Sequence, residues 1–174
     1  MWVFGYGSLM WDDWEKDFEG TRVDGAALVN YHRSFNKKST ERWGTPKAPG
    51  PTLGLEPKQG ERCVGTAFDI PGKHRDAVLA ALAVREGKSF TLAPLEVALP
   101  DGTSVTALVP VNDRTKRTYA GTLSLDARVA LAMKATGTGG ACVSYIQNIG
   151  SKLKELGIED AHIEAFLAEM KKRR

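Results

Sequence analysis

Cysteine and histidine are scarce in this 174-residue chain, and their scarcity excludes several kinds of site. Only Cys63 and Cys142 are present, far apart and outside any C-x-x-C spacing, so the sequence predicts neither a disulfide framework nor a zinc site. The three histidines are scattered along the chain, and none stands in a metal-binding or hydrolase motif. We therefore expect two reduced thiols and no metal.

Long apolar runs and an extended basic face are also missing. No segment approaches the roughly 20 apolar residues that span a bilayer, and the first residues lack a basic region followed by a long apolar stretch. We therefore expect a cytoplasmic protein with no membrane partner. The 24 Lys plus Arg against 21 Asp plus Glu give a net charge of +3, and much of the excess lies in residues 171–174. A terminal cluster is typical of a solvated helix end, so we expect no nucleic-acid partner.

The chain has enough apolar residues, 42% of the total, to form one core, which predicts a single domain over residues 1–174. Short apolar runs predict strands at residues 2–4, 26–35, 52–55, 63–70, 90–99 and 104–111. Helical spacing predicts helices at residues 74–85, 125–135, 140–156 and 160–172. Mostly strands followed by helices predict an α+β fold with a small curled sheet or β-barrel, surrounding helices and a helical C-terminal part.

Three connections between these elements can be predicted from Gly, Pro and Asp. Pro100-Asp101-Gly102 predicts a hairpin between the strands at 90–99 and 104–111. Lys58-Gln59-Gly60 predicts a turn that joins the strands at 52–55 and 63–70. The polar stretch from Lys37 to Gly50, which two prolines interrupt, predicts a loop.

The first candidate site is the stretch Gly5-Tyr6-Gly7-Ser8-Leu9, which must turn away from the first strand. It is no dinucleotide fingerprint, because Met10 replaces the third glycine, and it lacks the Gly-x-Ser-x-Gly pattern of a nucleophilic serine. Two glycines let successive N–H groups point into one concavity, which suits a carboxylate or an oxyanion. The alternative is an ordinary glycine turn. The second candidate is Glu86, at the end of the helix predicted at 74–85, although most such residues are merely solvated.

Several stretches spread over nearly the whole chain together resemble one family. The chain is similar to ChaC-like members of the γ-glutamylcyclotransferase superfamily. The matching stretches are Phe4-Gly5-Tyr6-Gly7-Ser8-Leu9-Met10-Trp11, Tyr31-His32-Arg33-Ser34-Phe35, Ser39-Thr40, Gly44-Thr45-Pro46, Pro49-Gly50, Val84-Arg85-Glu86 and Tyr145.

The resemblance implies a compact β-barrel with helices around it and an enzyme that cyclises γ-glutamyl compounds to 5-oxoproline. It implies that Glu86 is the catalytic carboxylate and that no metal or organic cofactor is needed. It also implies that the γ-glutamyl group is bound largely through main-chain N–H groups of the turn. The candidate substrate-binding residues are Tyr6, Gly7, Ser8, Leu9, Arg33 and Tyr145. The expected partner is therefore a small γ-glutamyl molecule.

Two positions depart from the family pattern and leave the substrate open. Phe90 stands where the family often has Tyr, and Cys142 where it often has Asn, so two hydrogen-bonding groups are lost. Glutathione, γ-glutamyl amino acids and γ-glutamyl amines all remain candidates, and the segment that contains Arg42 and Trp43 could reshape the leaving-group side.

Two other classes of function also remain open. A non-catalytic γ-glutamyl-binding module would not need Glu86. A nucleic-acid protein would use the mixed basic and aromatic residues Arg33, Lys37, Lys38, Arg42 and Trp43. The sequence leaves the oligomeric state open.

Overall fold

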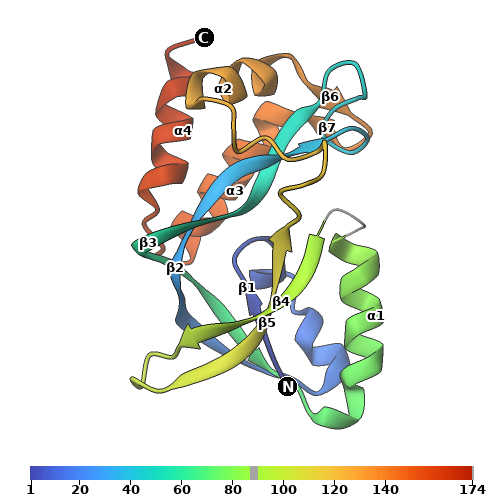
Figure 1. Ribbon diagram of the computed structural model, residues 1–174, viewed down its shortest axis with the longest axis vertical. Helices are drawn as coiled ribbons and strands as arrows, with labels where there is room; N and C mark the ends of the chain where they lie inside the picture. Colours follow the sequence, from blue (N-terminus) through green and yellow to red (C-terminus); the bar gives the residue numbers. More distant parts are fainter. Residues whose placement is uncertain (87–89, 174) are drawn as a thin grey trace. The chain divides into compact units, whose positions relative to one another are not determined.

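The computed structural model describes residues 1–86 and 90–173 of the chain (Figure 1). The chain folds into two compact units. The first unit comprises Met1–His32 and Pro57–Asp113, and the second comprises Arg33–Glu56 and Arg114–Arg174. The expectation of a single domain over residues 1–174 stays a prediction.

Five strands form a closed barrel in the order β1-β3-β2-β4-β5. Their bounds are β1 Trp2–Gly5, β2 Thr21–Ser39, β3 Gly50–Asp69, β4 Phe90–Ala98 and β5 Ser104–Asn112. β1 pairs antiparallel with the end of β3 and parallel with β5, where Trp2 lies opposite Ala107. The barrel confirms the predicted α+β fold class. The β4–β5 hairpin is also confirmed, and Gly102 in its turn takes a positive φ of 86° that favours glycine.

The strands predicted at 52–55 and 63–70 are one continuous strand, β3, so the predicted turn around Lys58-Gln59-Gly60 is wrong. Gly60 does take a positive φ of 83°, but its N–H donates to Asn30 Oδ1 on β2 at 2.9 Å. A glycine with positive φ can form a bulge inside a strand as readily as a reversal. The predicted loop is also shorter than expected, because β2 continues to Ser39.

The described part of the first unit also contains one helix and three short 3-10 turns. The 3-10 turns are η1 Ser8–Met10, η2 Trp14–Phe18 and η3 Gly72–His74, and the helix is α1 Arg75–Glu86. The helix confirms the prediction at 74–85 to within one residue. Its buried residues Val78 and Leu82 belong to a core cluster that includes Leu9, Val3 and Phe68. That shared cluster fixes α1 on β1, β3 and the turn that follows β1.

The second unit contains the three predicted C-terminal helices: α2 Leu125–Lys134, α3 Cys142–Glu155 and α4 Ala161–Lys171. Ser124 caps α2, since its hydroxyl accepts from the Ala127 N–H at 3.1 Å. The third helix begins two residues later than expected because Gly140–Ala141 forms strand β7, which pairs with β6 at Thr136–Gly137. None of the helices in the described part of the chain is long and apolar enough to cross a bilayer.

Candidate active site

The turn after β1 is anchored by the side chains of Tyr6 and Leu9. The Tyr6 hydroxyl donates to the Pro110 carbonyl on β5 at 2.9 Å, and Leu9 is buried in the core cluster. A Cβ at Gly5 would lie 2.9 Å from the Leu9 Cβ, a separation that real Cβ atoms essentially never show. Glycine is therefore required at Gly5 for the chain to turn this closely on itself. Ser8 alone among Tyr6, Ser8 and Leu9 has an exposed side chain.

The backbone N–H groups of this turn divide into two sets. The Met10 N–H donates to the Gly7 carbonyl at 2.9 Å, and the Trp11 N–H donates to the Ser8 carbonyl at 3.4 Å. Among the described residues, no acceptor is found for the N–H groups of Gly7, Ser8 and Leu9. Successive donors without an acceptor in the described part of the chain can bind an anion or an oxyanion. This arrangement is compatible with the anion-site interpretation of the sequence.

Glu86 is the last residue of α1 and is half-buried. Val78, Leu82 and Glu86 are spaced four residues apart, so they share one face of the helix. The first two residues pack in the core cluster with Leu9. The face of α1 that is buried against the turn residue Leu9 therefore carries Glu86 at its C-terminal end.

Arg85 joins the end of α1 directly to the turn. Its guanidinium donates to Ser8 Oγ at 3.0 Å and forms a close ion pair with Asp12. The structure therefore brings the two predicted parts of the site, Ser8 with its neighbours and Glu86, near one another within the first unit. In the sequence, Arg85 was noted only as part of the stretch Val84-Arg85-Glu86, so its contacts with Ser8 and Asp12 were not predicted. No sequence signal could have linked it to Asp12, more than 70 residues away.

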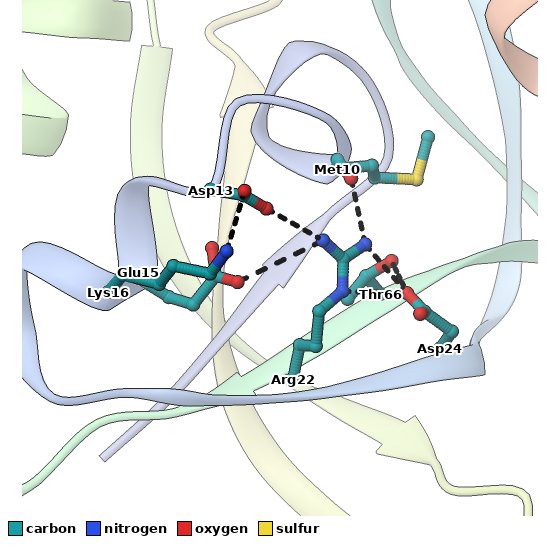
Figure 2. A network of polar contacts seen from close by, with 7 residues as sticks. All are labelled: Met10, Asp13, Glu15, Lys16, Arg22, Asp24 and Thr66. Atoms are coloured by element: carbon teal, nitrogen blue, oxygen red, sulfur yellow. Dashed lines mark hydrogen bonds and ion pairs between the residues drawn. The ribbon is translucent and has the colours of Figure 1, made fainter.

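A second arginine contacts the other end of the turn (Figure 2). Arg22, on β2, donates to the Met10 carbonyl at 2.8 Å and to Asp24 Oδ1 at 2.9 Å. The buried Thr66 donates to the same Asp24 oxygen at 2.7 Å. The Glu15 carboxylate is 2% exposed, and its Oε1 lies 3.9 Å from Arg22 Nη1. Sequence reasoning missed this network because its members are polar residues with no motif spacing.

Arg33 lies in the second unit, where its side chain is fully buried. Its guanidinium forms an ion pair with Asp160 at 3.0 Å. The other oxygen of Asp160 accepts from the N–H groups of His162 and Ile163, each at 3.1 Å, and so caps α4. These contacts attach β2 to the start of α4. The substrate-binding role of Arg33 stays a prediction.

Tyr145 also lies in the second unit, on α3. Its hydroxyl accepts from the Leu53 N–H at 3.1 Å, and its ring stacks on Trp43 with centroids 4.8 Å apart. The guanidinium of Arg42 lies 5.5 Å from the Trp43 ring, within reach of a cation–π contact. The Arg42–Trp43 segment is therefore ordered against Tyr145. The substrate-binding role of Tyr145 stays a prediction.

One cavity of about 540 Å³ lies between α3 and α4 in the second unit. Its lining includes Gly150, Leu153, Ile163 and Leu167, and none of the predicted site residues. Within residues 1–86 and 90–173, no three His, Cys, Asp or Glu side chains gather into a group that could hold a metal ion.

The fold places the chain in a known structural class. The crystal structure of a yeast γ-glutamyl cyclotransferase specific to glutathione superposes with a TM-score of 0.86, covering 100% of this chain and 96% of the yeast chain at 21% identity. The chain thus has the fold of the γ-glutamylcyclotransferases. The family model described as ChaC-like protein matches residues 1–173, and the chain belongs to the ChaC-like family.

Two relatives match at higher identity. The glutathione-specific γ-glutamylcyclotransferase of Escherichia coli is 31% identical over 174 residues, which cover 99% of this chain and 73% of the relative. The γ-glutamylcyclotransferase 2-3 of Arabidopsis thaliana is 32% identical over 172 residues, which cover 94% of this chain and 84% of the relative.

Proposed function

We propose that this protein is a γ-glutamylcyclotransferase that converts a γ-glutamyl compound into 5-oxoproline and a free amine. Membership of the ChaC-like family over residues 1–173 supports the proposal most strongly. The names of the Escherichia coli and Arabidopsis thaliana relatives point to the same reaction. The hydrogen bond from Arg85 to Ser8 adds a structural argument, because it brings the end of α1 to the glycine turn.

The reaction needs no co-reactant. The α-amino nitrogen of the substrate attacks its own γ-carbonyl carbon, a new ring C–N bond forms, and the bond from that carbon to the leaving amine breaks. Attacking and attacked atoms belong to one molecule, so orientation can supply up to roughly 7–11 kcal/mol of the barrier. The protein must therefore fold the substrate into shape and move one proton.

Glu86 is the group we assign to that proton. Its carboxylate would take a proton from the attacking ammonium and return it to the departing amine, a general acid–base role typically worth about 10²–10⁴-fold in rate. The N–H groups of Gly7, Ser8 and Leu9, which have no acceptor among the described residues, would meet the negative charge on the γ-carbonyl oxygen. Tyr6 would contribute through its backbone, because its hydroxyl is already bonded to Pro110.

We take glutathione as the first substrate to test, because the names of several relatives specify it. Cys142, which stands where the family often has Asn, is buried. Its thiol donates a hydrogen bond to the Pro51 carbonyl at 3.3 Å. A γ-glutamyl amino acid or amine is the alternative substrate. The cytoplasmic location expected from the sequence stays a prediction.

The proposal is tested by incubating the purified protein with glutathione, a γ-glutamyl dipeptide and a γ-glutamyl amine, and by measuring 5-oxoproline with mass spectrometry. The proposal requires product from at least one compound, and the relative rates identify the leaving group. Absence of product from all three, together with calorimetric binding of any of them, would instead favour a non-catalytic binding module.

A further inference from the structure

One network of polar contacts includes Met10, at the end of the glycine turn, and Thr66 on β3 (Figure 2). At the start of the turn, Gly5 on β1 lies directly opposite Thr66 on β3 in the antiparallel register. Thr66 donates to Asp24, which accepts from Arg22, and Arg22 donates to the carbonyl of Met10 at the end of the turn. The residues that enter and leave the turn are thus linked through three side chains.

Arg22 occupies the centre of this network and is held from several sides. Its Nη2 contacts both Asp24 at 2.9 Å and the Met10 carbonyl at 2.8 Å. Its Nη1 lies 3.6 Å from an oxygen of Asp13 and 3.9 Å from one of Glu15, and its side chain is only 27% exposed. A planar guanidinium surrounded by carboxylates is fixed in orientation, so its bond to the Met10 carbonyl is fixed as well.

We infer that Arg22 is a positioning residue for the reaction, an inference that rests on the proposed function. Arg22 holds the carbonyl of Met10, and the N–H of the same residue closes the turn onto the carbonyl of Gly7. The orientation of Gly7, Ser8 and Leu9 between those points therefore depends on a side chain from β2, outside the turn. Donors that act on developing charge lose their effect when they are misdirected, because their value depends on prior alignment.

A purely stabilising role for Arg22 predicts different behaviour. An ion pair that only adds stability would change the midpoint of unfolding and leave turnover per folded molecule unchanged. Replacement of a positioning residue changes kcat more than KM, because the negative charge on the oxyanion develops only in the transition state. Replacing it also changes how strongly the backbone N–H groups of the turn are protected from hydrogen exchange.

The experiment compares Arg22→Gln with Arg62→Gln, which replaces an exposed arginine on β3 of the same unit. We expect Arg22→Gln to lower kcat by at least about tenfold, with KM changed by less than about threefold. Hydrogen exchange, followed by mass spectrometry, should become faster at Met10 and Trp11 in the same variant. Arg62→Gln should match the wild type in both measurements.

Asp24→Asn provides a second variant in case Arg22→Gln folds poorly. It removes the charge that orients Arg22, so it should lower kcat in the same direction, and the double variant should lose little more than Arg22→Gln alone. A kcat equal to that of Arg62→Gln would overturn the inference, and so would a lower kcat with unchanged exchange in the turn. Failure of the wild-type protein to form 5-oxoproline would refute the proposed function, while the exchange measurement would still decide whether Arg22 orders the turn.

Discussion

Arg85 and Ser8 are joined by a hydrogen bond of 3.0 Å between the guanidinium and the hydroxyl oxygen. This contact links the last turn of α1 to the glycine turn after β1, two segments that are 77 residues apart in sequence. In this contact the Ser8 hydroxyl oxygen accepts a hydrogen bond from a cationic side chain. That use is different from the activation of a nucleophile, which needs a base beside the hydroxyl.

Ser8→Ala should therefore lower turnover less than Glu86→Gln does. The substitution removes one hydroxyl but leaves the backbone N–H of residue 8 in place, and Arg85 keeps its ion pair with Asp12. We expect a loss of about tenfold or less in kcat/KM, compared with about 10²–10⁴-fold for the loss of the acid–base group. Steady-state kinetics of the two variants make the comparison, and equal losses would indicate that Ser8 is a nucleophile.

Asp160→Ala should destabilise the protein strongly, by about 3–5 kcal/mol. The change removes the carboxylate that pairs with the fully buried guanidinium of Arg33 and also removes the N-cap of α4. Urea unfolding measures the effect, with Glu164→Ala in the exposed first turn of α4 as the control. A loss no larger than that of the control would show that the ion pair contributes little, and would leave substrate binding as the main reason for Arg33.

Cys142 should react very slowly with iodoacetamide in the native protein. Burial raises the pKa of its thiol from 9.0 to about 12, which lowers the reactive thiolate fraction at pH 8 by about a thousandfold. Mass spectrometry of the peptide that contains Cys142 follows the reaction, and protein unfolded in guanidinium chloride is the reference. Rapid labelling of the native protein would contradict the burial of this thiol.

Asp24 should make part of the free energy of unfolding depend on pH. Burial alone raises the pKa of Asp24, but hydrogen bonds from Arg22 and Thr66 outweigh it and hold that pKa below its ordinary value of 3.8. A carboxyl whose pKa is lowered by folding contributes stability above pH 3.8, and this contribution is lost as the pH falls through the lowered value. The effect is on the order of 1 kcal/mol or less, because Asp24 is largely exposed and solvent screens it.

Urea unfolding of Asp24→Asn at several pH values measures this dependence. The variant should be less stable than the wild type at pH 7, and the difference should shrink below about pH 4. Asp17→Asn, an exposed aspartate of η2, controls for the change in net charge. A difference that stays the same from pH 7 to pH 3 would show that the Asp24 carboxylate is not stabilised by its neighbours.

The sequence predicted those elements whose signals are local. Helical spacing predicted α2 to within one residue, and Pro100-Asp101-Gly102 predicted the β4–β5 hairpin. Gly60 misled the prediction, because a positive φ is shared by tight turns and strand bulges, and only the partner strand decides between them. The β6–β7 pair was missed because two-residue strands leave no periodicity.

In the candidate site, too, residues in recognisable local motifs were predicted, and contacts between distant segments were not. The turn that contains Ser8 was a candidate from its two glycines, and the roles of the turn and of Glu86 came from the resemblance to a family. Both lie in the first unit, and their shared site stays a prediction. The arginines that hold this turn could not be predicted. Arg22 reaches Met10 and Arg85 reaches Asp12 only because the barrel brings distant segments together.

Glu86 carries the proton transfer in the proposed reaction, so its replacement by an amide should nearly abolish turnover. The rate of 5-oxoproline formation by Glu86→Gln is compared with that of the wild type at neutral pH, on the substrate that the wild type turns over fastest. We expect a rate lower by about 10²–10⁴-fold, with an unchanged melting temperature, because the amide cannot accept the proton. A variant that retains most of the wild-type rate would contradict the account.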